Sequence, residues 1–327
     1  MIAVVSGMRS VTYTIRITIV FTLFSFALAP FSPASATEVG KATYLWNLSN
    51  FTGVIPFTWV RVVPDQARNE VYVCDGHLIY VFNAVGMEIY RFGEDELLGT
   101  PYDVAVLESG DLLLLSIFND GSPSPALVRC DYRGEFLERR PVSGIPDGFG
   151  TFTPTRMVLR GEKLYLADLS NMKVAVADRV GFIQESIDIA GILEMKEKQV
   201  ADFIALNGFD ADHEGNLYFT LPTLFKAYRL SADRTLKSFG TPGGSPGRFG
   251  VVAGIAVVRS GAIYVVDTLR SVVLAFDRDF NFLYEFGYRT PRPGGLVAPK
   301  EVTVSPGRIY VTQQGVRGVN VYQGISN

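Results

Sequence analysis

The sequence predicts an all-β fold: a six-bladed β-propeller of four-stranded antiparallel blades. Three observations lead to this prediction. A unit of four short strands recurs along the chain, its second strand returns six times, and the last copy is one strand short. The six copies lie about 41 to 53 residues apart, which is the spacing of propeller blades.

The clearest copy of the unit covers residues 254–287. Turn residues separate its strands, and the first three strands are rich in β-branched and aromatic residues, as half-buried strands are. The predicted second strands are Val71–Asp75, Leu112–Ser116, Leu164–Asp168, Leu217–Thr220, Ile263–Asp267 and Ile309–Thr312.

This unit resembles the repeat of the NHL family. It has a Gly-Ile-Ala-Val start at Gly254, an Ile-Tyr-Val-x-Asp strand ending at Asp267, an aromatic-Asp strand end at Asp277 and a Phe-Gly finish at Gly287. The resemblance covers nearly all of residues 37–327 and is thinnest in blade two. It implies the propeller fold but leaves the activity open, because propellers serve many functions.

Residues 1–36 are predicted to be a signal peptide. Arg9 and Arg16 give a positive start before an apolar run at Ile17–Leu28, and Ala34-Ser35-Ala36 offers a small-x-small cleavage pattern. We therefore expect a periplasmic or secreted protein with no membrane span after cleavage. An uncleaved N-terminal anchor is the alternative, although the apolar run is short for a span.

Residues 37–327 are predicted to form one propeller closed by its N-terminal strand. Blade six ends after the strand at residues 318–322, and Thr43–Leu48 is a strand that belongs to no blade. Pairing the two would complete blade six and remove an open sheet edge. One short inserted helix is expected at Glu194–Ala205, where apolar residues share a face.

The first strand of each blade should line the central channel. Alternate residues of a strand face opposite ways, and one set in these strands is apolar throughout. The opposite set supplies the candidate binding residues at the channel mouth: Trp59, Arg61, Asp103, Arg156, Asp210 and Glu301. They form either a ring of salt bridges that fixes the order of the blades or a site for a polar ligand, with Trp59 as an apolar wall.

Asp103, Asp210 and Glu301 are the candidate metal ligands, and Ca²⁺ is the candidate ion because it prefers carboxylate oxygens. Arg61 and Arg156 would compete for the same oxygens. No other cofactor is predicted. The resemblance implies a partial match to calcium-dependent lactonase-like propellers, but not to the lyases that use histidine-bound zinc.

The remaining polar and sulfur residues have structural interpretations. His77 and His213, the only histidines, fall in turns of different blades and on opposite faces, so a zinc site or a Ser-His-Asp relay is not expected. The aspartates that end second and third strands should bond to the turns that follow. Cys74 and Cys130 are expected to be buried free thiols rather than a disulfide.

The net charge and the long loops are the two features from which we predict the function. The net charge of −3 gives no basic face for nucleic acid. Long insertions at residues 117–125, 139–153 and 187–207 should emerge on the face of the charged channel mouth. We therefore expect a monomeric, exported, non-enzymatic binding or scaffold propeller that presents this face to another envelope or extracellular protein. The alternatives are a cation-dependent hydrolase or lyase with its site in the channel, and a carbohydrate or peptide binder.

Overall fold

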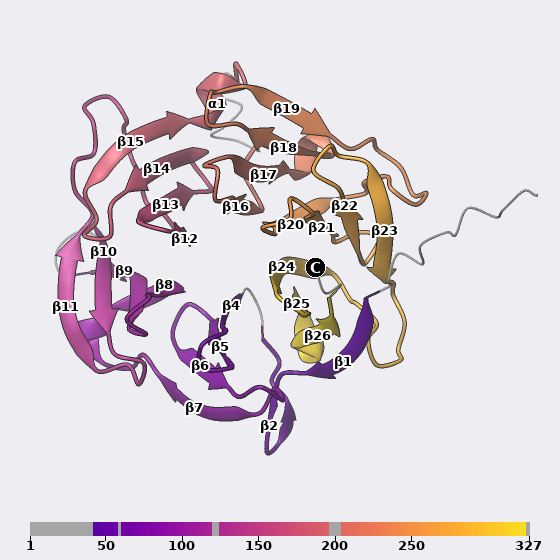
Figure 1. The fold of residues 1–327 in the computed structure, drawn as a ribbon, viewed down its shortest axis with the longest axis horizontal. Helices are drawn as coiled ribbons and strands as arrows, with labels where there is room; N and C mark the ends of the chain where they lie inside the picture. The colour runs from indigo at the N-terminus through magenta and orange to yellow at the C-terminus, as the bar shows by residue number, and fades with distance from the viewer. Residues whose placement is uncertain (1–41, 58–59, 120–123, 196–203, 325–327) are drawn as a thin grey trace, which may run out of the picture. The chain divides into compact units, whose positions relative to one another are not determined.

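The computed structural model describes residues 42–57, 60–119, 124–195 and 204–324. In the unit Glu38–Asn327, six four-stranded antiparallel sheets are arranged as a ring (Figure 1). The predicted all-β, six-bladed propeller is therefore confirmed.

The blades follow one another along the chain, each beginning with its innermost strand. Blade one is β4 (Arg61–Asp65), β5 (Glu70–Cys74), β6 (Ile79–Phe82) and β7 (Glu88–Phe92). Blade two is β8 (Thr100–Val106), β9 (Leu112–Phe118), β10 (Ser124–Cys130) and β11 (Phe136–Pro141). Blade three is β12 (Arg156–Arg160), β13 (Lys163–Asp168), β14 (Lys173–Ala177) and β15 (Ile183–Asp188).

The second half of the ring repeats this order. Blade four is β16 (Phe209–Ala211), β17 (Leu217–Leu221), β18 (Lys226–Leu230) and β19 (Leu236–Phe239). Blade five is β20 (Val252–Val257), β21 (Ile263–Asp267), β22 (Val272–Phe276) and β23 (Phe282–Gly287). Blade six is β24 (Pro299–Ser305), β25 (Arg308–Gln313) and β26 (Val319–Gln323), completed by β1 (Thr43–Asn47).

The core of the ring lies between the blades rather than within any one of them. The described residues form six hydrophobic clusters, and each cluster joins two neighbouring blades. The sixth cluster packs Leu48, Val60 and Val73 against Tyr310 and Val321, so that the last blade meets the first. A single blade leaves its apolar faces exposed, and the closed ring buries all of them.

The predicted N-terminal closing strand is confirmed. β1 pairs antiparallel with β26, with Thr43 opposite Gln323 (Figure 1). Buried Asn320 fixes the join: its Oδ1 accepts hydrogen bonds from Asn47 Nδ2 at 2.7 Å and Gln313 Nε2 at 2.6 Å. Its Nδ2 donates to the Gly295 carbonyl at 3.2 Å. The clasp therefore combines a β-ladder with a polar network that links both ends of the chain.

The insertions differ in part from the prediction. The one α-helix of the described residues, α1 (Ile189–Ile192), lies in the expected insertion but before the predicted stretch Glu194–Ala205. Most of that stretch, residues 196–203, lies outside the described residues. In the insertion at 117–125, Ile117 and Phe118 prolong β9 instead of forming a loop. None of the helices in the described part of the chain has the length and apolar character needed to span a membrane.

The two cysteines are free and buried, as predicted. Both belong to the cluster between blades one and two. Burial raises the pKa of each thiol to about 12, because the thiolate would lose its hydration.

A thiol-reactivity experiment tests this burial. The native protein at pH 8 should react with a disulfide reagent at least about 1000-fold more slowly than free cysteine, because a pKa near 12 leaves almost no thiolate. Both thiols should react at the ordinary rate once guanidinium has unfolded the chain. Fast reaction of either thiol in the native protein would contradict the burial.

Replacing Asn320 tests the clasp. Asn320→Ala removes the hydrogen-bond partner of four polar groups and should lower the free energy of unfolding by about 2 to 3 kcal/mol. Urea unfolding followed by tryptophan fluorescence measures the loss. Asn119→Ala, at an exposed asparagine, is the control and should leave the midpoint unchanged. An unchanged midpoint in Asn320→Ala would show that the network does not hold the ring closed.

Candidate functional site

The six innermost strands each pair on one edge only. β4, β8, β12, β16, β20 and β24 are bonded to the second strand of their own blade, and the other edge faces the channel (Figure 1). The N–H and C=O groups on such an edge need partners wherever water does not reach them. Polar side chains from neighbouring blades supply several of these partners.

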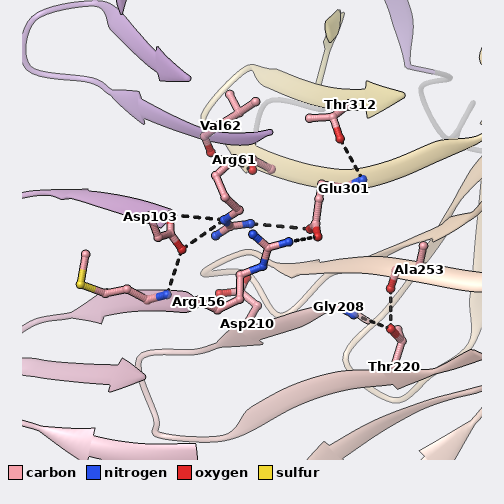
Figure 2. Close-up of polar contacts among 12 residues, drawn as sticks. Arg61, Val62, Asp103, Arg156, Gly208, Asp210, Thr220, Ala253, Glu301 and Thr312 are labelled. Carbon is pink, nitrogen blue, oxygen red and sulfur yellow. Dashed lines mark hydrogen bonds and ion pairs between the residues drawn. The ribbon is translucent and has the colours of Figure 1, made fainter. Parts of the chain in front are cut away.

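Asp103, on β8, is a fully buried carboxylate at the predicted channel mouth. Its Oδ2 accepts a hydrogen bond from the Met157 amide of the next blade at 2.8 Å, and its Oδ1 accepts one from Val104 N at 2.9 Å. Arg61 Nε reaches the same carboxylate from the preceding blade at 3.2 Å. Asp103 therefore connects three consecutive blades (Figure 2).

Glu301, on β24 of blade six, completes this group. Its Oε2 lies 3.6 Å from Arg61 Nη1, and its Oε1 accepts a hydrogen bond from Arg156 Nη2 (Figure 2). The Glu301 backbone N–H donates to Thr312 Oγ1 at 3.1 Å. We call Arg61, Asp103, Arg156 and Glu301 the mouth network. Two positive and two negative charges make it neutral, which is the condition under which buried charges are tolerated.

The two arginines of the mouth network differ in their surroundings. Burial opposes the charge of Arg61, but Asp103 and Glu301 together raise its pKa above the usual range. Burial also opposes the charge of Arg156, and here it prevails over Glu301, so that the pKa of Arg156 is lowered. The buried Nε of Arg156 has no hydrogen-bond partner in the described structure.

Asp210, on β16, belongs to a second charged pair deeper in the channel. Arg160 Nη2 lies 2.8 Å from Asp210 Oδ1, and the Val257 amide of the next blade donates to Oδ2 at 2.9 Å. Arg160 Nε also donates to the Ala211 carbonyl at 2.7 Å. Sequence reasoning missed Arg160, although it lies in the same alternating set of β12 as Arg156 and two pleats further along.

Polar residues at the ends of second strands hold the inner strands and the loops above them. Thr220 Oγ1 accepts a hydrogen bond from Gly208 N at 2.8 Å and donates to the Ala253 carbonyl (Figure 2). Gly208 is required there, because a Cβ atom would lie 2.5 Å from that carbonyl oxygen. Asp168 and Asp267 bond to their following turns, as predicted, and also to the loop before their own blade.

A cavity of about 260 Å³ lies in the channel next to the mouth network. It extends from Arg61 toward the ends of the inner strands, where Gln66, Arg160 and Ser305 line it together with Asp210. Val62, Val104, Ile255 and Val302 also line it, but their side chains are buried between the blades, so the exposed wall is more polar than apolar. The structure therefore separates the predicted site into a neutral ion-pair network and a cavity beside it.

The other candidate residues fall outside this arrangement. Trp59 lies outside the described residues. His77 is in the β5–β6 turn and His213 in the β16–β17 turn, so the alternating strand directions put them at opposite ends of the ring. Where residues are described, no three or more His, Cys, Asp and Glu side chains form a group that could hold a metal ion. Asp103, Asp210 and Glu301 are instead engaged by arginines and backbone amides.

The fold is shared by solved structures of low sequence identity. A gluconolactonase from Xanthomonas campestris is 15% identical, with a TM-score of 0.55 over 87% of this chain and 90% of that chain. An inactive histidine-to-alanine virginiamycin B lyase from Staphylococcus aureus, solved with quinupristin, is 11% identical, with a TM-score of 0.53 over 84% of each chain. A protein of unknown function from Bacteroides thetaiotaomicron is 13% identical, with a TM-score of 0.60 over 86% of this chain and 76% of that chain.

These comparisons correct the predicted function. No protein-family model and no curated protein sequence matches the chain, so the NHL resemblance stays a prediction. The similar structures include enzymes of both classes named in our alternative, and they contradict the expectation of a non-enzymatic binding or scaffold propeller. At these identities the likeness shows that this chain shares their fold, and it assigns neither activity to this chain.

Asp103→Asn tests whether the mouth network stabilises the ring. The variant leaves Arg61 and Arg156 facing only Glu301, and an uncompensated buried charge should lower the free energy of unfolding by about 3 to 5 kcal/mol. Urea unfolding gives the value. Glu162→Gln removes an exposed partner of Arg179 and should change nothing measurable. Equal midpoints for the two variants would mean that the network carries no stability.

Proposed function

We propose that the chain is a hydrolase or lyase whose site is the channel cavity beside the mouth network. One observation carries the proposal: the Asp210–Arg160 pair lies on the wall of a cavity inside the ring. Ligands commonly bind in concave cavities where a few polar groups converge. The enzymes with similar folds support the same class of function.

The pair offers the two groups that such chemistry needs. The Asp210 carboxylate is the proton acceptor, either from a water molecule in ester hydrolysis or from a carbon next to a carbonyl in elimination. The Arg160 guanidinium stabilises the negative charge that develops on the substrate oxygen in both reactions. Hydrogen bonds from Ala211 N at 2.8 Å and Val257 N at 2.9 Å fix the position of the carboxylate.

The size of the cavity favours a small substrate. Its volume of about 260 Å³ suits a sugar lactone better than a larger cyclic compound such as quinupristin. A small cyclic ester is therefore the substrate that we propose, by analogy with the gluconolactonase of similar fold.

No step of this proposal uses a metal ion. The candidate calcium ligands Asp103, Asp210 and Glu301 do not form a ligand set in the described residues, so the structure does not fit Ca²⁺ as the resident cofactor. Export to the periplasm or beyond, the NHL relationship and a protein partner remain proposals with sequence support only.

Asp210→Asn tests the proposed function. The wild-type protein should hydrolyse glucono-δ-lactone, and the variant should lose at least about 100-fold in kcat/KM, because it removes the proton acceptor. The exposed Asp233→Asn is the matched control and should keep full activity. Adding 5 mM EDTA or CaCl₂ should leave the rate unchanged.

Measurements of folding and an assay with a second compound show whether a loss of activity comes from the proposed site. Circular dichroism and urea unfolding establish that Asp210→Asn is folded, and Arg160→Gln gives an independent loss of activity if the pair acts together. Full activity in a folded Asp210→Asn protein would overturn the proposed role. Wild-type protein that does not act on the lactone would overturn the proposed substrate, and activity on quinupristin instead would also overturn the argument from the size of the cavity.

A further inference from the structure

A second cavity lies between blades four and five, away from the channel. It measures about 260 Å³ and shares no lining residue with the channel cavity. Arg229 of β18, Arg259 of the β20–β21 turn and Arg278 of the β22–β23 turn all line it, together with His213. Three guanidinium groups around one cavity need either carboxylate partners or a ligand.

A cavity at the equivalent place between blades two and three shows how this chain compensates such arginines. That cavity, of about 290 Å³, contains Arg129 of β10, which occupies the place that Arg229 occupies in β18. Arg129 lies 2.5 Å from Asp111 and 3.6 Å from Glu138. The guanidinium in blade two is thus satisfied by two carboxylates of its own blade.

Blade four lacks both of these carboxylates. Glu138 is the cross-strand partner of Arg129, and the corresponding partner of Arg229 is Lys237. Asp111 directly precedes the second strand of blade two, and Asn216 directly precedes that of blade four. Asn216 in the place of Asp111 removes a negative charge, and Lys237 in the place of Glu138 replaces a negative charge with a positive one. Arg229 therefore has neither of the ionic partners that Arg129 has.

Arg229 is nevertheless held in a defined position. Its Nη1 donates to the Arg278 carbonyl at 3.2 Å, and its guanidinium stacks 4.8 Å from the centre of the Phe280 ring. Its Nε is buried and has no hydrogen-bond partner among the residues that the structure describes. Across the described residues, no carboxylate lies within 4 Å of the charged nitrogens of Arg229 or Arg259.

Three acidic residues, Asp212, Glu214 and Asp279, also line the cavity, but none of them forms an ion pair with Arg229 or Arg259 within the described residues. Asp212 accepts hydrogen bonds from Glu214 N, Asn216 N, Asn216 Nδ2 and Tyr218 OH, so its oxygens are used by its own turn. Glu214 has a side chain that is 73% exposed and lies 3.9 Å from Arg278. Burial lowers the pKa of His213, and Arg160 and Arg259 lower it further, whereas Asp212 and Asp210 raise it.

We propose that the cavity between blades four and five binds the oxyanion group of a small organic molecule, a phosphate or a carboxylate, through Arg229, Arg259 and Arg278. Guanidinium groups match the geometry and charge of such groups. The volume exceeds that of a bare ion, so the rest of the ligand occupies the remainder. This site is independent of the reaction proposed for the channel.

Isothermal titration with inorganic phosphate and with citrate, at constant ionic strength in chloride, tests the proposal. The wild-type protein should bind at least one of the two probes at one site per chain, and the stronger probe identifies the class of oxyanion. Arg229→Gln should weaken that binding at least about 10-fold. Arg129→Gln, at the equivalent place in blade two, is the matched control and should keep wild-type affinity.

A charge exchange tests the reason given for the site. Lys237→Glu restores the carboxylate that blade two places opposite its arginine, and it should weaken binding about as much as Arg229→Gln does while leaving all three arginines in place. Lys163→Glu makes the same change of net charge in blade three and should have no effect.

Three results would overturn the site: no binding of either probe to folded wild-type protein at 10 mM, unchanged affinity in Arg229→Gln, or equal loss in Arg129→Gln. Lactone hydrolysis should be the same in Arg229→Gln as in the wild type. Failure of the anion site is therefore distinguishable from failure of the proposed enzyme activity.

Discussion

The channel-facing edge of each inner strand is the constraint on which the rest of this structure depends. Each of these strands has a sheet neighbour on one side only, and the narrow channel limits how much water reaches the other side. Side chains that reach from one blade to the next supply hydrogen-bond partners for this free edge. Asp103 accepts the Met157 amide, Asp210 accepts the Val257 amide, and Thr303 donates to the Val62 carbonyl. Hydrophobic clusters hold the blades together, and these polar contacts fix how they are placed around the axis.

This constraint also shapes the chemistry open to the channel. A carboxylate whose oxygens bind backbone amides and an arginine is a poor ligand for a metal ion, because the ion would have to displace those contacts. Asp103 is the extreme case, fully buried and bonded to three blades. Asp210 also accepts a hydrogen bond from a backbone amide of the next blade, but it lines the cavity as well. The side chain of its partner Arg160 is 25% exposed there. Structural and reactive roles thus meet at Asp210, and only there does the proposed reaction have space for a substrate.

Periodicity in the sequence predicts the fold and much of the site, and it fails where partners depend on three-dimensional closure. The alternation of apolar and polar residues identified Arg61, Asp103, Arg156 and Glu301, and the missing last strand identified the clasp, because both are local patterns repeated in every blade. It did not show that Arg156 meets Glu301, since these two residues are 145 positions apart and approach only when the ring closes. It placed Asp210 one pleat deeper than Asp103, Arg156 and Glu301, but it did not show that Asp210 pairs with Arg160. The function was predicted wrongly because fold-level patterns carry no information about catalysis.

Departures from the repeat are more informative about binding than the repeat itself. Residues that recur at one position, such as Asp131, Asp178 and Asp277, each accept amide hydrogen bonds from their own turn and are explained by local structure. Arg129 and Arg229 also recur, but only Arg129 keeps its carboxylate partners. Because the two blades share their backbone arrangement, the change to Asn216 and Lys237 is not required by the fold. A charge that the fold holds in place without an ionic partner is maintained at a cost in stability, and binding of an oppositely charged ligand is the physical role that offsets this cost.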